Sequence, residues 1–153
     1  MMQNIPLWIV FHFLVYGIAG SHCTAQIVMT EFMAAPRSGE AEWIELRNCS
    51  TETVDLQYWT VHDRTQKPVH LAETACMLHP GAFVVCTSQY PLGNRWTISY
   101  DSVLVLTNLP TLNNSGDDIV LCDRDGIIRD SVRYTASWLG ETGQSVERID
   151  PDG

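Results

Sequence analysis

The strongest constraint on the fold is a two-residue alternation of side chains within short segments. In Glu42–Asn48 (EWIELRN), Ile44 and Leu46 share one parity and Trp43 has the other. Successive side chains of a strand point to opposite faces, so this pattern is typical of a strand with one buried face. No segment after residue 25 has a convincing helical periodicity, and we therefore predict an all-β protein.

Similar segments recur along the chain and are separated by turn residues. A face switch within Thr53–Asp63 needs an extra residue near Gln57 and Tyr58, which a bulge or tight bend supplies. Asp125-Gly126 favours a tight hairpin, because glycine readily adopts positive φ. The predicted strands are Ile27–Met33, Glu42–Asn48, Thr53–Asp63, Ala82–Ser88, Val103–Leu106, Ile119–Cys122, Ile127–Tyr134 and Gln144–Ile149. About seven or eight short strands are typical of one β-sandwich domain.

The first 25 residues predict a secretory signal peptide. They contain no Asp, Glu, Lys or Arg, and the apolar run Leu7–Ala19 is shorter than a membrane-spanning helix needs. Cys23 and Ala25 place small residues at positions −3 and −1 of a cleavage site after Ala25. A buried core helix is the alternative. We expect a secreted mature chain that begins at Gln26 and has no transmembrane segment.

The acidic balance of the chain narrows the classes of partner. Its formal net charge is −9, and Lys67 is its one lysine. Nucleic-acid binding depends on clustered lysines and arginines that displace counterions from phosphates, whereas the arginines of this chain are scattered. We therefore expect no nucleic-acid partner.

Four cysteines remain after the predicted cleavage, namely Cys49, Cys76, Cys86 and Cys122. In an exported domain they are candidates for two disulfides, in any of three pairings. Four buried thiols, or one bridge with two thiols, fit the sequence equally well, because a sequence gives no distances. The cysteine spacing does not match a zinc site.

Several segments, in their order and spacing, resemble the lamin-tail domain family, of the type found in secreted bacterial proteins. The resemblance spans most of Ile27–Ile149. It is carried by EFMAAP at 31–36, EWIELRN at 42–48, VDLQYW at 54–59, LHPGAFVV at 78–85, LNNSGDDIVLCDRDG at 112–126, RDSVRY at 129–134, Trp138, and QSVERI at 144–149. The resemblance implies an immunoglobulin-like β-sandwich at residues 26–153, preceded by the signal peptide at 1–25.

Two features depart from the family pattern. Tyr58 stands where members often have a glycine, and a side chain makes a left-handed bend costlier. The chain also stops at Asp150–Gly153, where such domains usually continue. We therefore expect residues 26–153 to be a C-terminally truncated domain.

The sequence offers little support for a reaction. It lacks the GxSxG, HExxH and P-loop motifs, and its mature histidines, His62, His70 and His79, match no metal-binding spacing. Four carboxylates suit either turns or calcium binding, and we favour turns: Asp117, Asp118, Asp123 and Asp125. We expect no catalytic residue, no metal site and no cofactor.

Trp43 is the candidate residue for an exposed interaction surface, because its parity is opposite to that of Ile44 and Leu46. The family resemblance implies binding or scaffolding. We therefore expect a secreted, non-enzymatic module that binds an unidentified protein or cell-surface partner. The alternative is an accessory domain of a longer extracellular hydrolase or nuclease whose catalytic part follows residue 153.

Overall fold

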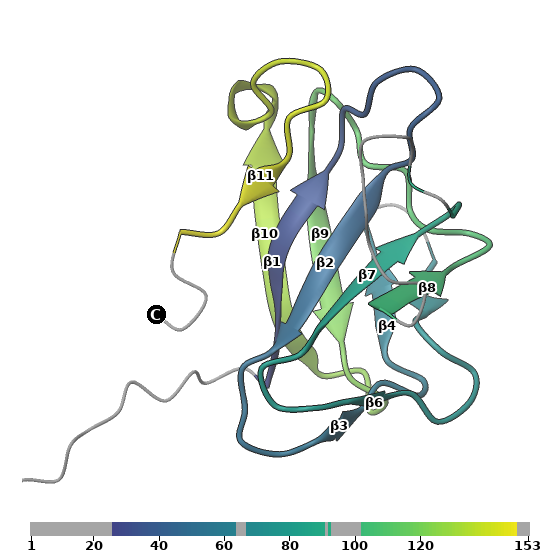
Figure 1. Ribbon diagram of the computed structural model, residues 1–153. Coiled ribbons are helices and arrows are strands. Elements are labelled where there is room, and N and C mark those ends of the chain that lie inside the picture. Colours follow the sequence, from purple (N-terminus) through teal and green to yellow (C-terminus); the bar gives the residue numbers. More distant parts are fainter. Residues whose placement is uncertain (1–25, 64–66, 91, 93–101, 150–153) are drawn as a thin grey trace, which may run out of the picture.

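The short segments form strands that pair into two main sheets (Figure 1). The computed structural model describes residues 26–63, 67–90, 92 and 102–149, so the predicted signal peptide lies outside the described residues. The larger sheet has the order β11-β1-β2-β7-β8 and the smaller one β10-β9-β4-β5, while β3 pairs with β6. The strands are β1 (Ile27–Met33), β2 (Trp43–Asn48), β3 (Val54–Asp55), β4 (Thr60–His62), β5 (Val69–His70), β6 (Met77–Leu78), β7 (Phe83–Thr87), β8 (Val103–Val105), β9 (Gly116–Cys122), β10 (Ile128–Thr135) and β11 (Val146–Glu147). A short 3₁₀ helix, η2 (Ala136–Trp138), follows β10.

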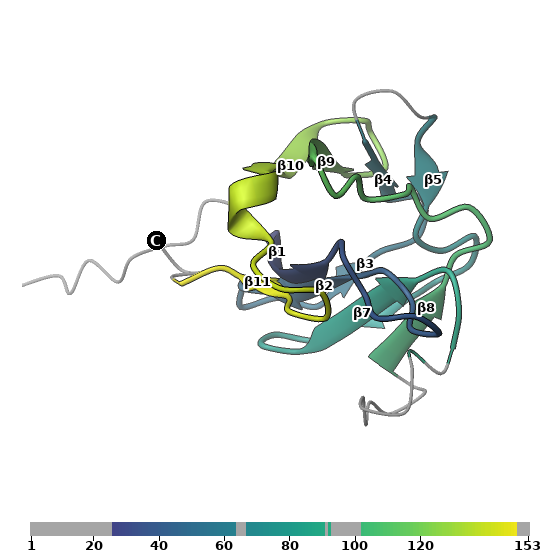
Figure 2. The same ribbon diagram turned by 90° about the horizontal axis from the view of Figure 1, so that it is seen from above.

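The two sheets face each other and enclose the main core (Figure 2). Ile44 and Leu46 of β2 are both buried in it, as their shared parity predicts. Val84–Thr87 of β7 is buried throughout, in agreement with its nearly continuous apolar sequence. The predicted all-β sandwich is therefore confirmed. Among the described residues, no helix has the length and apolar character to cross a membrane.

The predicted face switch lies at a tight bend between β3 and β4. Tyr58 has a φ of 62°, in the left-handed region, and the N–H of Trp59 donates to the carbonyl oxygen of Leu56 at 3.1 Å. The bend lets Leu56 and Trp59 both enter the core. A tyrosine thus occupies a backbone conformation that favours glycine, because the buried residues on either side hold the bend in place.

The predicted hairpin joins β9 and β10. Gly126 has a φ of 77°, and the Oδ1 atom of Asp123 accepts the N–H groups of Asp125 and Ile127, each at 2.9 Å. Asp123 also forms an ion pair with Arg129, with Nε and Oδ2 2.7 Å apart. The carboxylate therefore satisfies the turn backbone and the next strand together.

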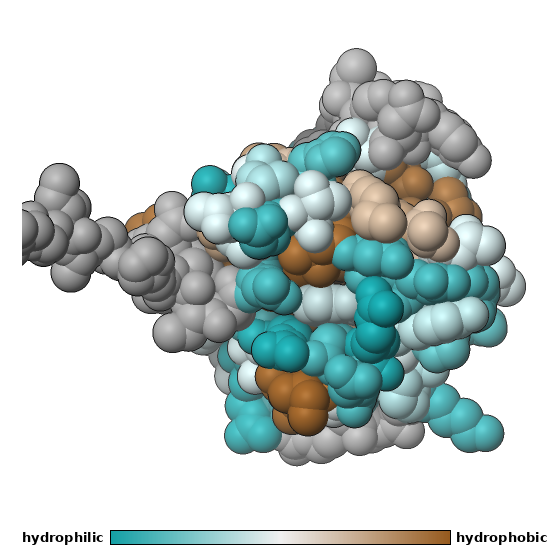
Figure 3. Space-filling view, turned by 90° about the horizontal axis from the view of Figure 1, so that it is seen from below, coloured by the Kyte–Doolittle hydropathy of each residue, from teal (hydrophilic) through white to brown (hydrophobic). Residues whose placement is uncertain are grey.

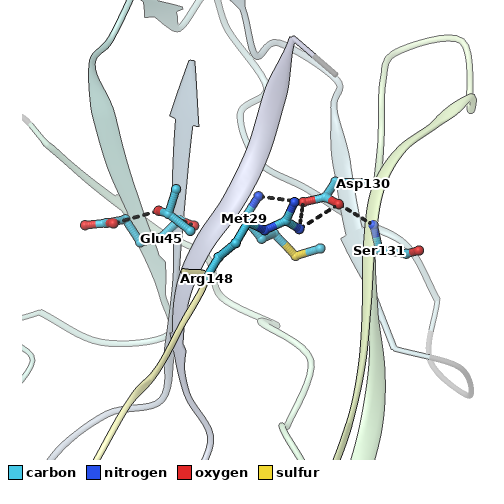
Figure 4. Close-up of polar contacts among 6 residues, drawn as sticks. Met29, Glu45, Asp130, Ser131 and Arg148 are labelled. Carbon is cyan, nitrogen blue, oxygen red and sulfur yellow. Dashed lines mark hydrogen bonds and ion pairs between the residues drawn. The ribbon is translucent and has the colours of Figure 1, made fainter. Parts of the chain in front are cut away.

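One carboxylate joins the two sheets along the side where β1 and β10 are neighbours. The Oδ2 atom of Asp130, on β10, accepts the backbone N–H of Met29, on β1, at 2.7 Å. Both carboxylate oxygens also accept from the Nη2 atom of Arg148, at 2.9 and 2.8 Å (Figure 4). Met29 needs this acceptor because β11 pairs with β1 only at Glu31 and Phe32. Asp130 therefore links β1, β10 and the segment after β11.

We predict that Asp130→Ala lowers the free energy of unfolding by about 2 kcal/mol, because it leaves the Met29 N–H and the Arg148 guanidinium without their acceptor. Urea denaturation measures the change. Arg133→Gln is the matched control, since the Arg133 side chain is 71% exposed and its solvent-screened ion pair with Asp118 should contribute little to stability. Equal losses in the two variants would contradict the role of Asp130.

Candidate interaction groove

An apolar groove of about 230 Å³ opens where β1 and β11 face β10 and η2. We call it the edge groove. A β-bulge between Met29 and Glu31 shifts the parity of β1, so that Met29 and Phe32 both face inward and are almost fully buried. The groove is lined by Met29, Thr30, Glu31, Phe32, Val132, Trp138, Val146, Glu147 and Arg148.

Trp138 is the large exposed side chain of the edge groove. It lies on η2, directly after β10, and 53% of its surface is exposed. Leu139, the next residue, is buried in the core and donates its N–H to the carbonyl oxygen of Ala136 at 3.3 Å. The turn is thus anchored by Leu139, which leaves Trp138 at the surface above an apolar floor.

Three glutamates form a row across neighbouring strands of the larger sheet. Glu31 of β1 is the register partner of both Glu147 of β11 and Glu45 of β2. We call Glu147, Glu31 and Glu45 the acidic row. The Ser145 hydroxyl donates to Glu31, and the Thr30 hydroxyl donates to Glu45 at 2.7 Å. Like charges directly opposite each other on a sheet are destabilising, and the two hydroxyl donors offset only part of this repulsion.

The electrostatics of Glu31 reflect its position in the middle of the acidic row. Burial raises the pKa of Glu31, the hydrogen bond from Ser145 lowers it, and the charges of Glu45 and Glu147 raise it further. The net effect is a pKa above the ordinary value of 4.5. Glu31 and Glu147 belong to β1 and β11, the strands that form one wall of the edge groove.

The other hollows among the described residues have more polar linings than the edge groove. The end of the sandwich that carries β3 and β6 is mostly hydrophilic, with separate hydrophobic patches (Figure 3). The hollow at this end is lined largely by polar residues, including Asp55 and Arg124, whose Oδ2 and Nη2 atoms are 3.7 Å apart. The edge groove is therefore the better candidate for a protein-interaction site.

The prediction that Trp43 is exposed is wrong. Its side chain is only 3% exposed and belongs to a second apolar cluster on the outer side of β2. Trp43 points to the outer face of β2, as its parity predicts, but other side chains cover the outer face at this position. The cluster comprises Met33, Ala41, Trp43, Val85 and Leu92. Trp43 therefore stabilises the fold. Among the described residues, Trp138 is the exposed tryptophan, and the alternation did not identify it.

The four candidate disulfide cysteines are free thiols in the structure. Cys86 and Cys122 are buried, and Cys49 and Cys76 are half-buried. Burial, with a smaller effect of the nearby Cys76, raises the pKa of Cys86 to about 12. The Cys86 thiol is therefore not activated as a nucleophile.

Cys122 and His62 come closest to a pairing of nucleophile and base. The Cys122 Sγ atom lies 3.9 Å from the His62 Nε2 atom, and His62 Nδ1 lies 2.8 Å from the carbonyl oxygen of Asp63. Burial and the charge of Asp123 raise the pKa of Cys122, and Thr60 lowers it in part. This direction is opposite to the lowered pKa of reactive cysteines, so the contact is better explained by packing.

The remaining candidate residues have local partners. His70 contacts Glu73, and His79 contacts Thr53. The four aspartates are similarly placed in turns and ion pairs: Asp117 with Asn113, Asp118 with Arg133, Asp123 with Arg129, and Asp125 in the β9–β10 turn. In the part of the chain that the structure describes, no three His, Cys, Asp or Glu side chains come together as a metal site.

Comparison with known proteins gives one family match. The model of the Lamin Tail Domain family matches residues 21–136. The comparison with curated proteins gives no match. The matched region includes β1 and β10 but ends before Trp138 and β11, which complete the edge groove.

We predict contrasting effects of removing the two tryptophans. Trp43→Ala should lower the free energy of unfolding by about 3–5 kcal/mol, because it opens a cavity in the second cluster. Trp138→Ala should cost less than about 1 kcal/mol, because the side chain is largely exposed. Denaturant titration measures both changes. A larger loss of stability in Trp138→Ala than in Trp43→Ala would contradict the burial of Trp43 and the exposure of Trp138.

We predict that Glu31→Gln stabilises the protein by about 0.5 kcal/mol at pH 7, because it removes two like-charge contacts. A carboxyl whose folded pKa is raised contributes stability below its unfolded pKa, and that contribution is lost as the pH rises through the folded pKa. The variant and the wild type should therefore converge below pH 4.5. Thermal unfolding across this range tests the effect, with the exposed Glu52→Gln as control. A variant less stable than the wild type at pH 7 would refute it.

Proposed function

Because the chain belongs to the lamin-tail domain family, an immunoglobulin-like family, we propose that it is a secreted, non-enzymatic module that binds a protein or cell-surface partner through the edge groove. The family and fold support a role in protein interaction. The signal-peptide pattern at residues 1–25 supports secretion. The acidic net charge of −9 makes a nucleic-acid partner unfavourable.

The exposed position of Trp138 is the observation that carries this proposal. Tryptophan is enriched among the residues that dominate binding energy at protein interfaces, because it buries a large apolar surface with few rotatable bonds. Trp138 lies beside a groove whose inner wall includes Phe32 and Val146. A partner side chain inserted there would contact Trp138 and the apolar wall at once.

The chemistry of the described side chains supports a binding role more than a reaction. Cys122 and His62 make a nucleophile-and-base contact, but the raised pKa of the thiol does not favour attack. Arg148, which lines the groove, is bound in an ion pair with Asp130. The Cys122–His62 contact and the Arg148–Asp130 ion pair therefore support the stability of the fold, and neither provides an activated nucleophile.

We predict that Trp138→Ala weakens binding of the natural partner by about tenfold or more, because the substitution removes the large aromatic contact at the groove. The partner is first isolated on the immobilised protein from the surface and extracellular fraction of the source cells. Calorimetry with the purified partner then gives the dissociation constants.

Phe83→Ala is the matched control, since Phe83 is 46% exposed and lies outside the edge groove, next to Arg47. It should bind the partner as the wild type does. A partner that binds Trp138→Ala with unchanged affinity would contradict the proposed use of the groove.

A further inference from the structure

We infer that the edge groove and the acidic row together bind an extended segment of a partner protein in which basic and apolar residues alternate. This inference rests on the proposed function and specifies the chemistry of the partner. It follows from the different character of the two faces of the larger sheet at its β11 edge.

The outer face at this edge is acidic. Glu45, Glu31 and Glu147 follow one another from β2 through β1 to β11, the outermost strand. Within the described residues, no lysine or arginine forms an ion pair with any of the three. The two nearby arginines have other contacts, because Arg148 binds Asp130 and Arg47 lies over the Phe83 ring at 5.5 Å.

The inner face at the same edge is apolar. Val146 of β11 is the register partner of Phe32 of β1, and both line the edge groove with Met29 and Val132. Trp138 covers the opposite side of the groove. A volume of about 230 Å³ suits one large or two small apolar side chains.

Among the strands of the described residues, β11 is the outermost of the larger sheet, so its backbone can pair with a further strand. The N–H of Arg148 donates to the carbonyl oxygen of Thr30 at 2.7 Å, so the backbone of Arg148 faces β1. Backbone groups of neighbouring residues in an antiparallel strand face opposite sides, which directs those of Glu147 away from β1. An exposed strand edge of this kind is a site where an extended peptide adds to a sheet.

The parity of an added strand then specifies its sequence pattern. A residue opposite Glu147 would lie on the outer face and continue the acidic row, where a lysine or arginine would relieve the repulsion. The residues on either side of it would point inward, toward Val146 and the groove. The favoured segment is therefore apolar–basic–apolar around the residue opposite Glu147.

The charge of the chain argues against the other occupants of this edge. A second copy carries the same net charge of −9 and would bring a second acidic row to the first. Anionic lipid surfaces would likewise be repelled. A basic polypeptide is the occupant with complementary charge.

The test uses four synthetic peptides with blocked ends. The first alternates as Lys-Leu-Lys-Leu-Lys. The second has the same composition without alternation, Lys-Lys-Leu-Leu-Lys. The third and fourth replace every lysine of the first by glutamine or by glutamate. Titrations are followed by NMR at the indole N–H of Trp138 and the amide of Glu147.

We expect the alternating basic peptide to bind about tenfold more tightly than the other three and to shift both signals, with an affinity that falls as salt is added. Glu31→Gln combined with Glu147→Gln should abolish this advantage. Glu52→Gln combined with Glu73→Gln removes the same charge from distant exposed sites and should leave the affinity unchanged.

Equal binding of the glutamine peptide, or of the peptide without alternation, would overturn the inference. So would a failure of the alternating peptide to shift Trp138 and Glu147, or a shift of both with protein concentration alone, which would indicate a second copy. In each case, a natural partner that still loses affinity for Trp138→Ala would leave the proposed function standing.

Discussion

The arrangement of this sandwich depends on the carboxylate of Asp130. A β-sandwich has two open sides, where the outermost strands of its sheets are not joined by backbone hydrogen bonds. On the side of β1 and β10, Asp130 supplies the connection through the Met29 N–H and the Arg148 guanidinium. An inward-pointing charge on an edge strand also disfavours uncontrolled pairing with other chains. Here the same charge fixes the spacing of the two sheets.

The edge groove is a consequence of this spacing. Asp130 and Arg148 close one part of the open side, and Leu139 anchors η2 in the core, so that the space between them is lined by side chains from both sheets. The acidic row lies on the other face of the same strand edge. A sheet edge that combines an apolar inner face with repelling carboxylates on its outer face is costly in isolation, and a partner with complementary charge would offset that cost.

Much of the fold could be predicted from local sequence patterns. Alternation identified the buried face of β2, the face switch identified the bend at Tyr58, and Asp125-Gly126 identified the hairpin. The two-residue strands β5 and β6 escaped prediction because two residues carry no periodicity.

The candidate site was harder to predict from the sequence than the fold. Parity gave the correct face for Trp43 but could not say what covers it, and the contact of Asp130 with Met29 joins residues far apart in the sequence. The secretion signal and an attached catalytic domain stay predictions, and the four candidate disulfide cysteines are free thiols in the structure.

Hydrogen exchange at the Met29 amide tests the central role of Asp130 most directly, because the carboxylate is the acceptor of that N–H and lies on the opposite sheet. If Asp130 joins the two sheets into one cooperative unit, the Met29 amide exchanges only with global unfolding, at the same free energy as the amides of the central strand β2. Fast exchange of the Met29 amide, while the amides of β2 remain protected, would show that the edge opens independently and would contradict the account.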